Sequence, residues 1–149
     1  MDWTELETST YQGHVIKHVL GATVLGWVVI EDAMHVLLDV GLLWTIYVNA
    51  EMSLMAQSVA IQDLESDEVN RAEIEQIDSE AQLLITHGRE ATGLTRFTVA
   101  PVECTIITVE VFASASRRRV VIAGESADIE IEALLERTGF AIEARPHQR

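Results

Sequence analysis

The chain has 149 residues, of which 48% are apolar, and this predicts a single domain over residues 1–149 rather than a disordered chain. Its 24 acidic and 10 basic side chains leave a formal net charge of −14. Because phosphate groups are bound by basic surfaces, this charge argues against nucleic acid and against anionic membranes as partners. Cys104 is the only cysteine, which excludes an intramolecular disulfide.

Lys17 is the only lysine among the 10 basic residues, and the others are arginines. This composition is expected of a halophilic protein, because molar salt shortens the screening length to about 3 Å and mutes repulsion between carboxylates. Long lysine stems would add apolar surface that such salt drives together. The alternative is an ordinary acidic protein encoded by a GC-rich genome, which also favours arginine over lysine.

The most apolar run of the chain covers residues 15–30. It is shorter than the roughly 20 residues of a membrane-spanning helix, contains Lys17 and His18, and is followed by Glu31. The chain also begins without the basic segment of a secretory signal. We therefore predict buried strands over residues 15–30, no membrane span and a cytoplasmic location.

Residues 44–54 alternate between an apolar and a polar face, with Trp44, Ile46 and Val48 on the apolar side and Thr45 and Tyr47 opposite. Strict alternation predicts one half-buried strand. Glycines and acidic residues divide the preceding segment, and a short strand is expected over residues 35–38.

A helix is predicted from about residue 67 to residue 87. Acidic residues open this segment, Gly88 follows it, and a loop is expected over residues 89–95. Its apolar residues recur at helical spacing; they are Ile74, Ile77, Ala81, Leu84 and Ile85.

Strands return in the last third of the chain, over about 104–111, 119–123, 128–135 and 140–144, with a turn at 114–116. A helix over 127–137 is the alternative for one of these strands, because glutamate, alanine and leucine favour helix. The tail 145–149 is expected to fray. The fold class predicted is therefore α+β, mostly antiparallel strands in two groups with one long helix between them.

His14 and His18 have the spacing of a helical metal pair. On a helix their rings would lie within about 6 Å of each other. On a strand they would lie roughly 13 Å apart and could not share one ion. The valine-rich, glycine-interrupted context favours a strand, so no metal is expected here.

Two further acidic segments suggest an acid–base site and a calcium site, but the sequence pattern does not require either. His35 lies near Glu31, Asp32 and Asp39 along the chain, which invites an acid–base role, but a turn histidine explains it as well. Residues 63, 65 and 67 resemble the start of a calcium loop. That loop would need glycine and glutamate where Glu68 and Ile74 stand, so the segment is interpreted as a solvated helix cap.

Arg117, Arg118 and Arg119 form the only basic cluster. They could dock an anion or an acidic partner, or they could neutralise nearby carboxylates. Cys104 follows Glu103 in an acidic chain, whereas a reactive thiol needs an electropositive setting, so a buried, inert thiol is expected.

No local motif for a nucleophile elbow, phosphate loop, dinucleotide site or zinc site is found, and no cofactor is predicted. Two hypotheses remain. The first is a non-enzymatic interaction or small-ligand-binding domain that forms a homodimer through residues 15–43, because those strands are apolar on both faces. The alternative is an enzyme whose site is dispersed, with His14, His18 and His35 as first candidates.

Residues 11–21 (YQGHVIKHVLG) and 41–48 (GLLWTIYV) resemble small acidic haloarchaeal proteins of uncharacterised function. The resemblance covers about the first third of the chain. It implies no activity and no site residues.

Overall fold

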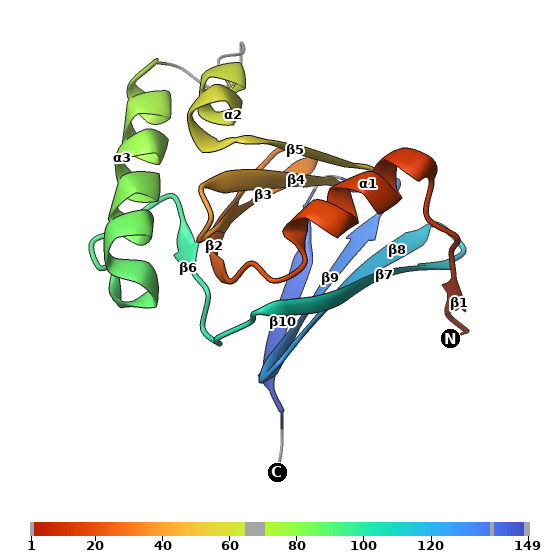
Figure 1. Cartoon of the computed structure of the whole chain (residues 1–149). Coiled ribbons are helices and arrows are strands. Elements are labelled where there is room, and N and C mark those ends of the chain that lie inside the picture. The colour runs from red at the N-terminus through yellow and green to blue at the C-terminus, as the bar shows by residue number, and fades with distance from the viewer. Residues whose placement is uncertain (1, 65–70, 138, 148–149) are drawn as a thin grey trace.

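The computed structural model describes residues 2–64, 71–137 and 139–147, and in these ranges it contains two five-stranded antiparallel sheets and three α-helices (Figure 1). The first sheet has the order β5-β4-β3-β2-β6 and the second has the order β1-β7-β8-β9-β10. The chain runs through β1 and α1, then β2–β5, then α2 and α3, and then β6–β10. This arrangement confirms the predicted α+β class with a long helix between two strand groups.

The elements have the following bounds. The first sheet consists of β2 (Val24–Ile30), β3 (Ala33–Leu38), β4 (Leu42–Tyr47), β5 (Met52–Ala56) and β6 (Thr98–Val99). The second consists of β1 (Thr4–Glu5), β7 (Ile106–Ser114), β8 (Arg117–Gly124), β9 (Ala127–Leu134) and β10 (Ala141–Pro146). The helices are α1 (Thr10–Val19), α2 (Gln57–Asp63) and α3 (Arg71–His87), and a short 3-10 helix follows at Gly88–Glu90.

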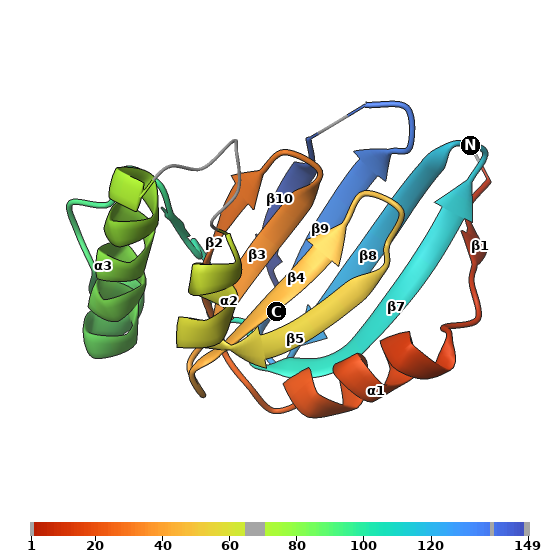
Figure 2. The same ribbon diagram turned by 90° about the horizontal axis from the view of Figure 1, so that it is seen from above.

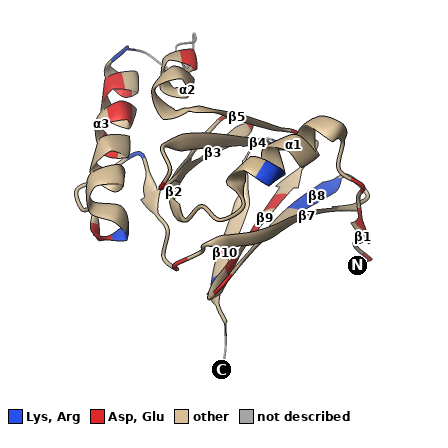
Figure 3. Cartoon of the chain, viewed as in Figure 1, with Lys and Arg blue, Asp and Glu red and all other residues tan. Residues whose placement is uncertain are grey.

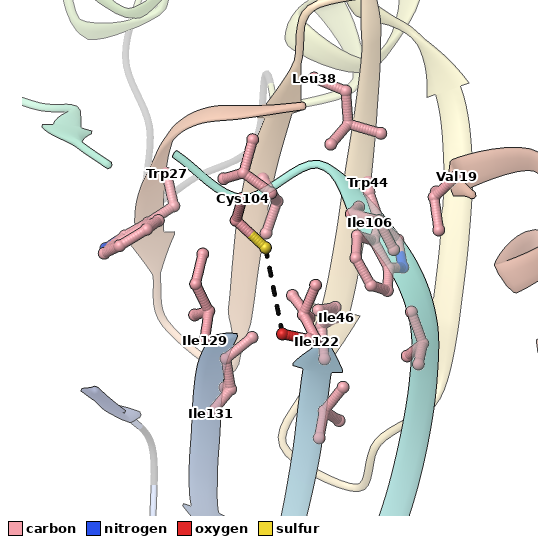
Figure 4. Packing of buried hydrophobic residues seen from close by; sticks show 14 of the residues in the cluster. Val19, Trp27, Leu38, Trp44, Ile46, Cys104, Ile106, Ile122, Ile129 and Ile131 are labelled. Carbon is pink, nitrogen blue, oxygen red and sulfur yellow. Dashed lines mark hydrogen bonds between the residues drawn. The ribbon is translucent and has the colours of Figure 1, made fainter. Parts of the chain in front are cut away.

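The first sheet is covered on both faces. One face packs on the second sheet through side chains such as Trp44, Ile46 and Ile129 (Figure 4). The other face packs on α2 and α3 (Figures 1 and 2). Leu37 lies there in one apolar cluster with Leu84. The strand faces that were expected to form a dimer interface are therefore buried within the chain, which removes the reason for placing an interface there.

Residues 10–19 form a helix, so the prediction of strands over the whole of residues 15–30 is wrong for its first part. The Ser9 side chain accepts the N–H of Gln12 at 3.0 Å, and the Gln12 side chain accepts the N–H of Ser9 at 2.8 Å. This reciprocal capping box starts the helix, and Val15 and Val19 bury its apolar face. The Gln12 amide also donates to the carbonyl of Ala50 at 2.7 Å, which holds α1 beside the first sheet.

Residues 44–54 form a hairpin, not one strand. The chain turns between β4 and β5, where Ala50 has a φ of 68° and the N–H of Tyr47 donates to Glu51 at 2.8 Å. Trp44 faces Leu54 across the two strands. Across the two strands, even-numbered residues pair with even-numbered residues. The alternation of apolar and polar residues therefore continues through the turn, and the sequence pattern does not reveal the turn.

The last third of the chain follows the predicted strand pattern. Residues 127–134 are strand, so the helical alternative for this segment is wrong. Their inward side chains are buried in every second position, and Ile131 pairs with Val120 of β8. The tail departs from the prediction at its start, because Arg145 and Pro146 belong to β10 and the N–H of His147 donates to Ser126 at 2.8 Å. The other tail residues lie outside those described.

The predicted long helix is α3, and its described part begins at Arg71. Residues 67–70, which were predicted to open it, lie outside the described residues. Ile77, Ala81 and Leu84 are buried as their spacing predicts, whereas Ile85 is exposed. The segment after it begins with the 3-10 turn rather than an irregular loop.

Candidate functional site

The three consecutive arginines open β8 and divide between the two faces of the second sheet, because neighbouring strand residues point to opposite sides. Arg117 and Arg119 share one face, and both guanidinium groups form ion pairs with Glu132 of β9. Arg118 instead donates to the carbonyls of Ala115 at 3.0 Å and Arg117 at 2.9 Å. The cluster therefore does neutralise a nearby carboxylate, as one of the two sequence interpretations expected.

Trp3 provides an aromatic platform under the same arginines. The Cζ atom of Arg119 lies 4.1 Å from the Trp3 ring centroid, and that of Arg117 lies 5.5 Å from it. Both distances fall within the range of cation–π attraction. Trp3 directly precedes β1, which pairs with β7 at the edge of the second sheet, and β7 in turn pairs with β8. Sequence reasoning missed Trp3 because no local pattern links it to residues more than a hundred positions away.

A cavity of about 570 Å³ lies beside this cluster, between the start of β8, the end of β9 and the start of β10. Its walls combine the cations of Arg117 and Arg137 and the carboxylate of Glu132 with apolar surface from Phe140 and Leu134. The other lining residues are small; they are Ala133, Gly139 and Ala141. In a chain with a net charge of −14, this cavity wall has more cations than anions. Figure 3 shows the arginines of β8 in blue on the ribbon.

The described structure brings His14 and His18 together, in contrast to the strand prediction. They lie one helical turn apart on α1, with ring centroids 4.6 Å apart. Both side chains are exposed. Neither lines the cavity beside the arginines.

His35 lies on the opposite face of the first sheet, under α2, and is buried. Its Nδ1 atom lies 2.9 Å from Oγ1 of Thr45, and burial lowers the pKa of His35 to about 4, so the ring is neutral near pH 7. The adjoining cavity has a volume of about 150 Å³ and is also lined by Ser53 and Asp63. This is too small for most ligands of drug size.

The acids that neighbour His35 in the sequence are not its partners in space. Glu31 and Asp32 are exposed in the turn between β2 and β3, and Asp39 accepts the N–H of Thr23 at 2.9 Å. Since the three candidate histidines lie on two separate surfaces, they do not form one dispersed site.

Cys104 is fully buried, as predicted. Burial, and to a lesser degree the charge of Asp128, raise the pKa of this thiol to about 11. The thiolate is therefore scarce at neutral pH, and the residue is unsuited to nucleophilic chemistry. Its Sγ atom lies 4.0 Å from the carbonyl oxygen of Ile122 within the core (Figure 4).

Comparison with known proteins gives no further assignment: no family model, curated protein or solved structure significantly matches the chain. Within the described residues, none of the helices is long and apolar enough to cross a membrane.

Proposed function

We propose that the chain is a non-catalytic small-ligand-binding domain whose ligand is an organic anion with an apolar part. The observation that carries the proposal is the cavity beside the β8 arginines, in which guanidinium groups and an aromatic ring share one wall. Guanidinium groups bind carboxylates and phosphates through charge-assisted hydrogen bonds. Apolar surface from Phe140 and Leu134 would bind a ring or short chain on the same molecule.

The size of the cavity supports a small molecule. Its volume of about 570 Å³ lies inside the range of about 300–1,000 Å³ that is typical of small-molecule sites. Arg137 is exposed at its rim and would make first contact with an incoming anion. Arg117 also lines the cavity, and its guanidinium group is held between Glu132 and the Trp3 ring. Holding donors in place before binding lowers the entropy cost of binding.

Phenylacetate is a suitable probe, because it joins a carboxylate to an apolar ring. Titration of the ¹⁵N-labelled full chain, followed by NMR, should give saturable shifts for the amides of Gly139 and Ala141. Phenylacetamide, which lacks the charge, and acetate, which lacks the ring, should each bind at least about tenfold more weakly, a difference of about 1.4 kcal/mol.

Arg137→Gln should weaken phenylacetate binding about tenfold, as expected for the loss of one charge-assisted contact. Arg71→Gln, which removes an exposed arginine at the start of α3, is the matched control and should leave binding unchanged. Absence of saturable shifts at the cavity, or equal binding by the two variants, would overturn the proposal.

The proposal differs from the sequence-based expectation in one respect. Self-association is left out, because the strand faces that motivated it are covered by the second sheet and by the helices. The enzymatic alternative has no observation in its favour. His14 and His18 lie apart from His35, and the Cys104 side chain is buried in the core.

A further inference from the structure

We propose that His14 and His18 form a two-imidazole site for one divalent transition-metal ion on the exposed surface of α1. The inference is independent of the anion site, which lies on other elements. It depends on the helix at residues 10–19, which places the two ring centroids 4.6 Å apart with the rings tilted by 58°. A strand would have separated them beyond the reach of one ion.

The hydrogen bonding of His18 fixes which of its nitrogens is available. Its Nδ1 atom lies 2.9 Å from the carbonyl oxygen of His14. A carbonyl oxygen only accepts, so Nδ1 carries the hydrogen and Nε2 of the neutral ring keeps its lone pair. Metal-binding histidines are commonly oriented in this way, by a bond from the second ring nitrogen to a backbone carbonyl. The His18 ring is thus prepared to bind through Nε2 without rearranging the helix.

The donor set selects the class of ion. Imidazole nitrogens suit Cu²⁺, Ni²⁺ and Zn²⁺, whereas Mg²⁺ and Ca²⁺ prefer oxygen ligands. No group of three or more histidine, cysteine or acidic side chains gathers anywhere in the described ranges. The pair therefore supplies two ligands, and water or an external donor completes the coordination. The chain's net charge of −14 favours the approach of cations, although Lys17 lies on the same helix and opposes it locally.

Copper is the best probe, because imidazole sites bind Cu²⁺ most tightly among these ions and its electron paramagnetic resonance reports bound nitrogens. Titration of the full chain at neutral pH should show one Cu²⁺ at this site, with two equivalent imidazole nitrogens in the spectrum. The second imidazole binds intramolecularly, so His14→Gln or His18→Gln should each weaken binding roughly 100-fold. Each variant should leave one coupled histidine nitrogen.

His87→Gln is the matched control, because it removes an exposed histidine at the end of α3. It should leave affinity and spectrum unchanged. Both histidines of the pair are exposed, and far-ultraviolet circular dichroism would verify that the variants keep their helices. A single coupled nitrogen in the unaltered protein, or affinities of the His14 and His18 variants within a few-fold of it, would overturn the proposal. So would an equal loss in the His87 variant.

Discussion

The carboxylate of Glu80 on α3 accepts the backbone N–H of Phe97 at 2.9 Å, and so ties the long helix to the segment that leads into β6. The same carboxylate accepts the N–H groups of Thr95 at 3.1 Å and Arg96 at 2.9 Å. Only 4% of Glu80 is exposed, so these bonds replace the water that the charge has lost. They hold α3 to the segment that enters β6, the edge strand of the first sheet.

Glu80→Gln should lower the free energy of unfolding by about 2 kcal/mol, because one strong acceptor is lost and donors are left without a partner. Urea unfolding at constant salt would measure the change. Glu75→Gln removes an exposed acid from the same helix and should alter stability by no more than about 0.5 kcal/mol. Equal effects of the two variants would mean that the Glu80 bonds contribute nothing measurable.

The pH dependence provides a second test of Glu80. Burial raises the pKa of Glu80, but the N–H groups of Phe97, Thr95 and Arg96 together hold it below its ordinary value of 4.5. The stabilisation is therefore present above pH 4.5 and is lost as the pH falls through the folded-state pKa. The stability difference between the unaltered protein and Glu80→Gln should shrink over that interval.

His35 predicts a separate loss of stability as the pH falls, over an interval that lies above that of Glu80. Its pKa falls from 6.5 to about 4 on folding, because burial disfavours the charged ring. Above pH 6.5 the His35 ring is neutral in both states. Below pH 6.5 the ring is protonated in the unfolded chain but stays neutral in the folded chain. From there to about pH 5, stability should fall by about 2 kcal/mol, at 1.36 kcal/mol per pH unit.

Urea unfolding at several pH values would show this loss, and His35→Gln should remove it. His87→Gln, an exposed histidine, should keep the full slope. A His35 variant that retains the slope of the unaltered protein would show that another group causes it.

Two glycines should respond to alanine in opposite directions. At Gly13, inside α1, an added Cβ would meet nothing closer than 3.9 Å, so Gly13→Ala should stabilise the protein by about 0.5–1 kcal/mol. At Gly26, on β2, the Cβ would lie 2.5 Å from the carbonyl oxygen of Thr98 on β6. Gly26→Ala should therefore cost about 1–3 kcal/mol. Thermal melts of both variants would test these signs, and a destabilising Gly13→Ala would argue against the helix at residues 10–19.

The charge of −14 predicts a strong dependence on salt. Repulsion among carboxylates weakens as salt shortens the screening length from about 10 Å at 0.1 M to about 3 Å at 1 M. We expect the Tm to rise by many degrees between 0.1 and 2 M potassium chloride, and sodium chloride should act similarly. A Tm that stays flat over this range would be incompatible with a salt-adapted protein and would favour an ordinary acidic chain.

Local periodicity was sufficient for several elements. The 3.6-residue spacing of Ile77, Ala81 and Leu84 predicted α3, and the alternation around Ile129 and Ile131 predicted β9. In both cases one face is buried and the other is more exposed, so the pattern of polarity records the geometry directly. The capping box between Ser9 and Gln12 also marks a helix start and was overlooked beside the apolar run that follows it.

Long-range pairing decided what the sequence left open. The alternation over residues 44–54 is compatible with one strand or with a hairpin of even register, and only the pairing of Trp44 with Leu54 distinguishes them. The apolar faces of β2–β4 required a cover, but the sequence alone did not specify whether a second chain or the chain's own second sheet and helices supply it.

The candidate sites divide in the same way. The sequence identified the arginine cluster and the His14–His18 spacing as chemically notable. The tertiary structure placed Trp3 under Arg119 and joined Phe140 and Arg137 into one cavity wall with Arg117. Local propensity acts over a few residues, whereas strand order and register depend on contacts between distant segments whose free energy no short pattern records. The sequence therefore determined which groups are present and most of the secondary structure, and folding alone decided which of those groups meet.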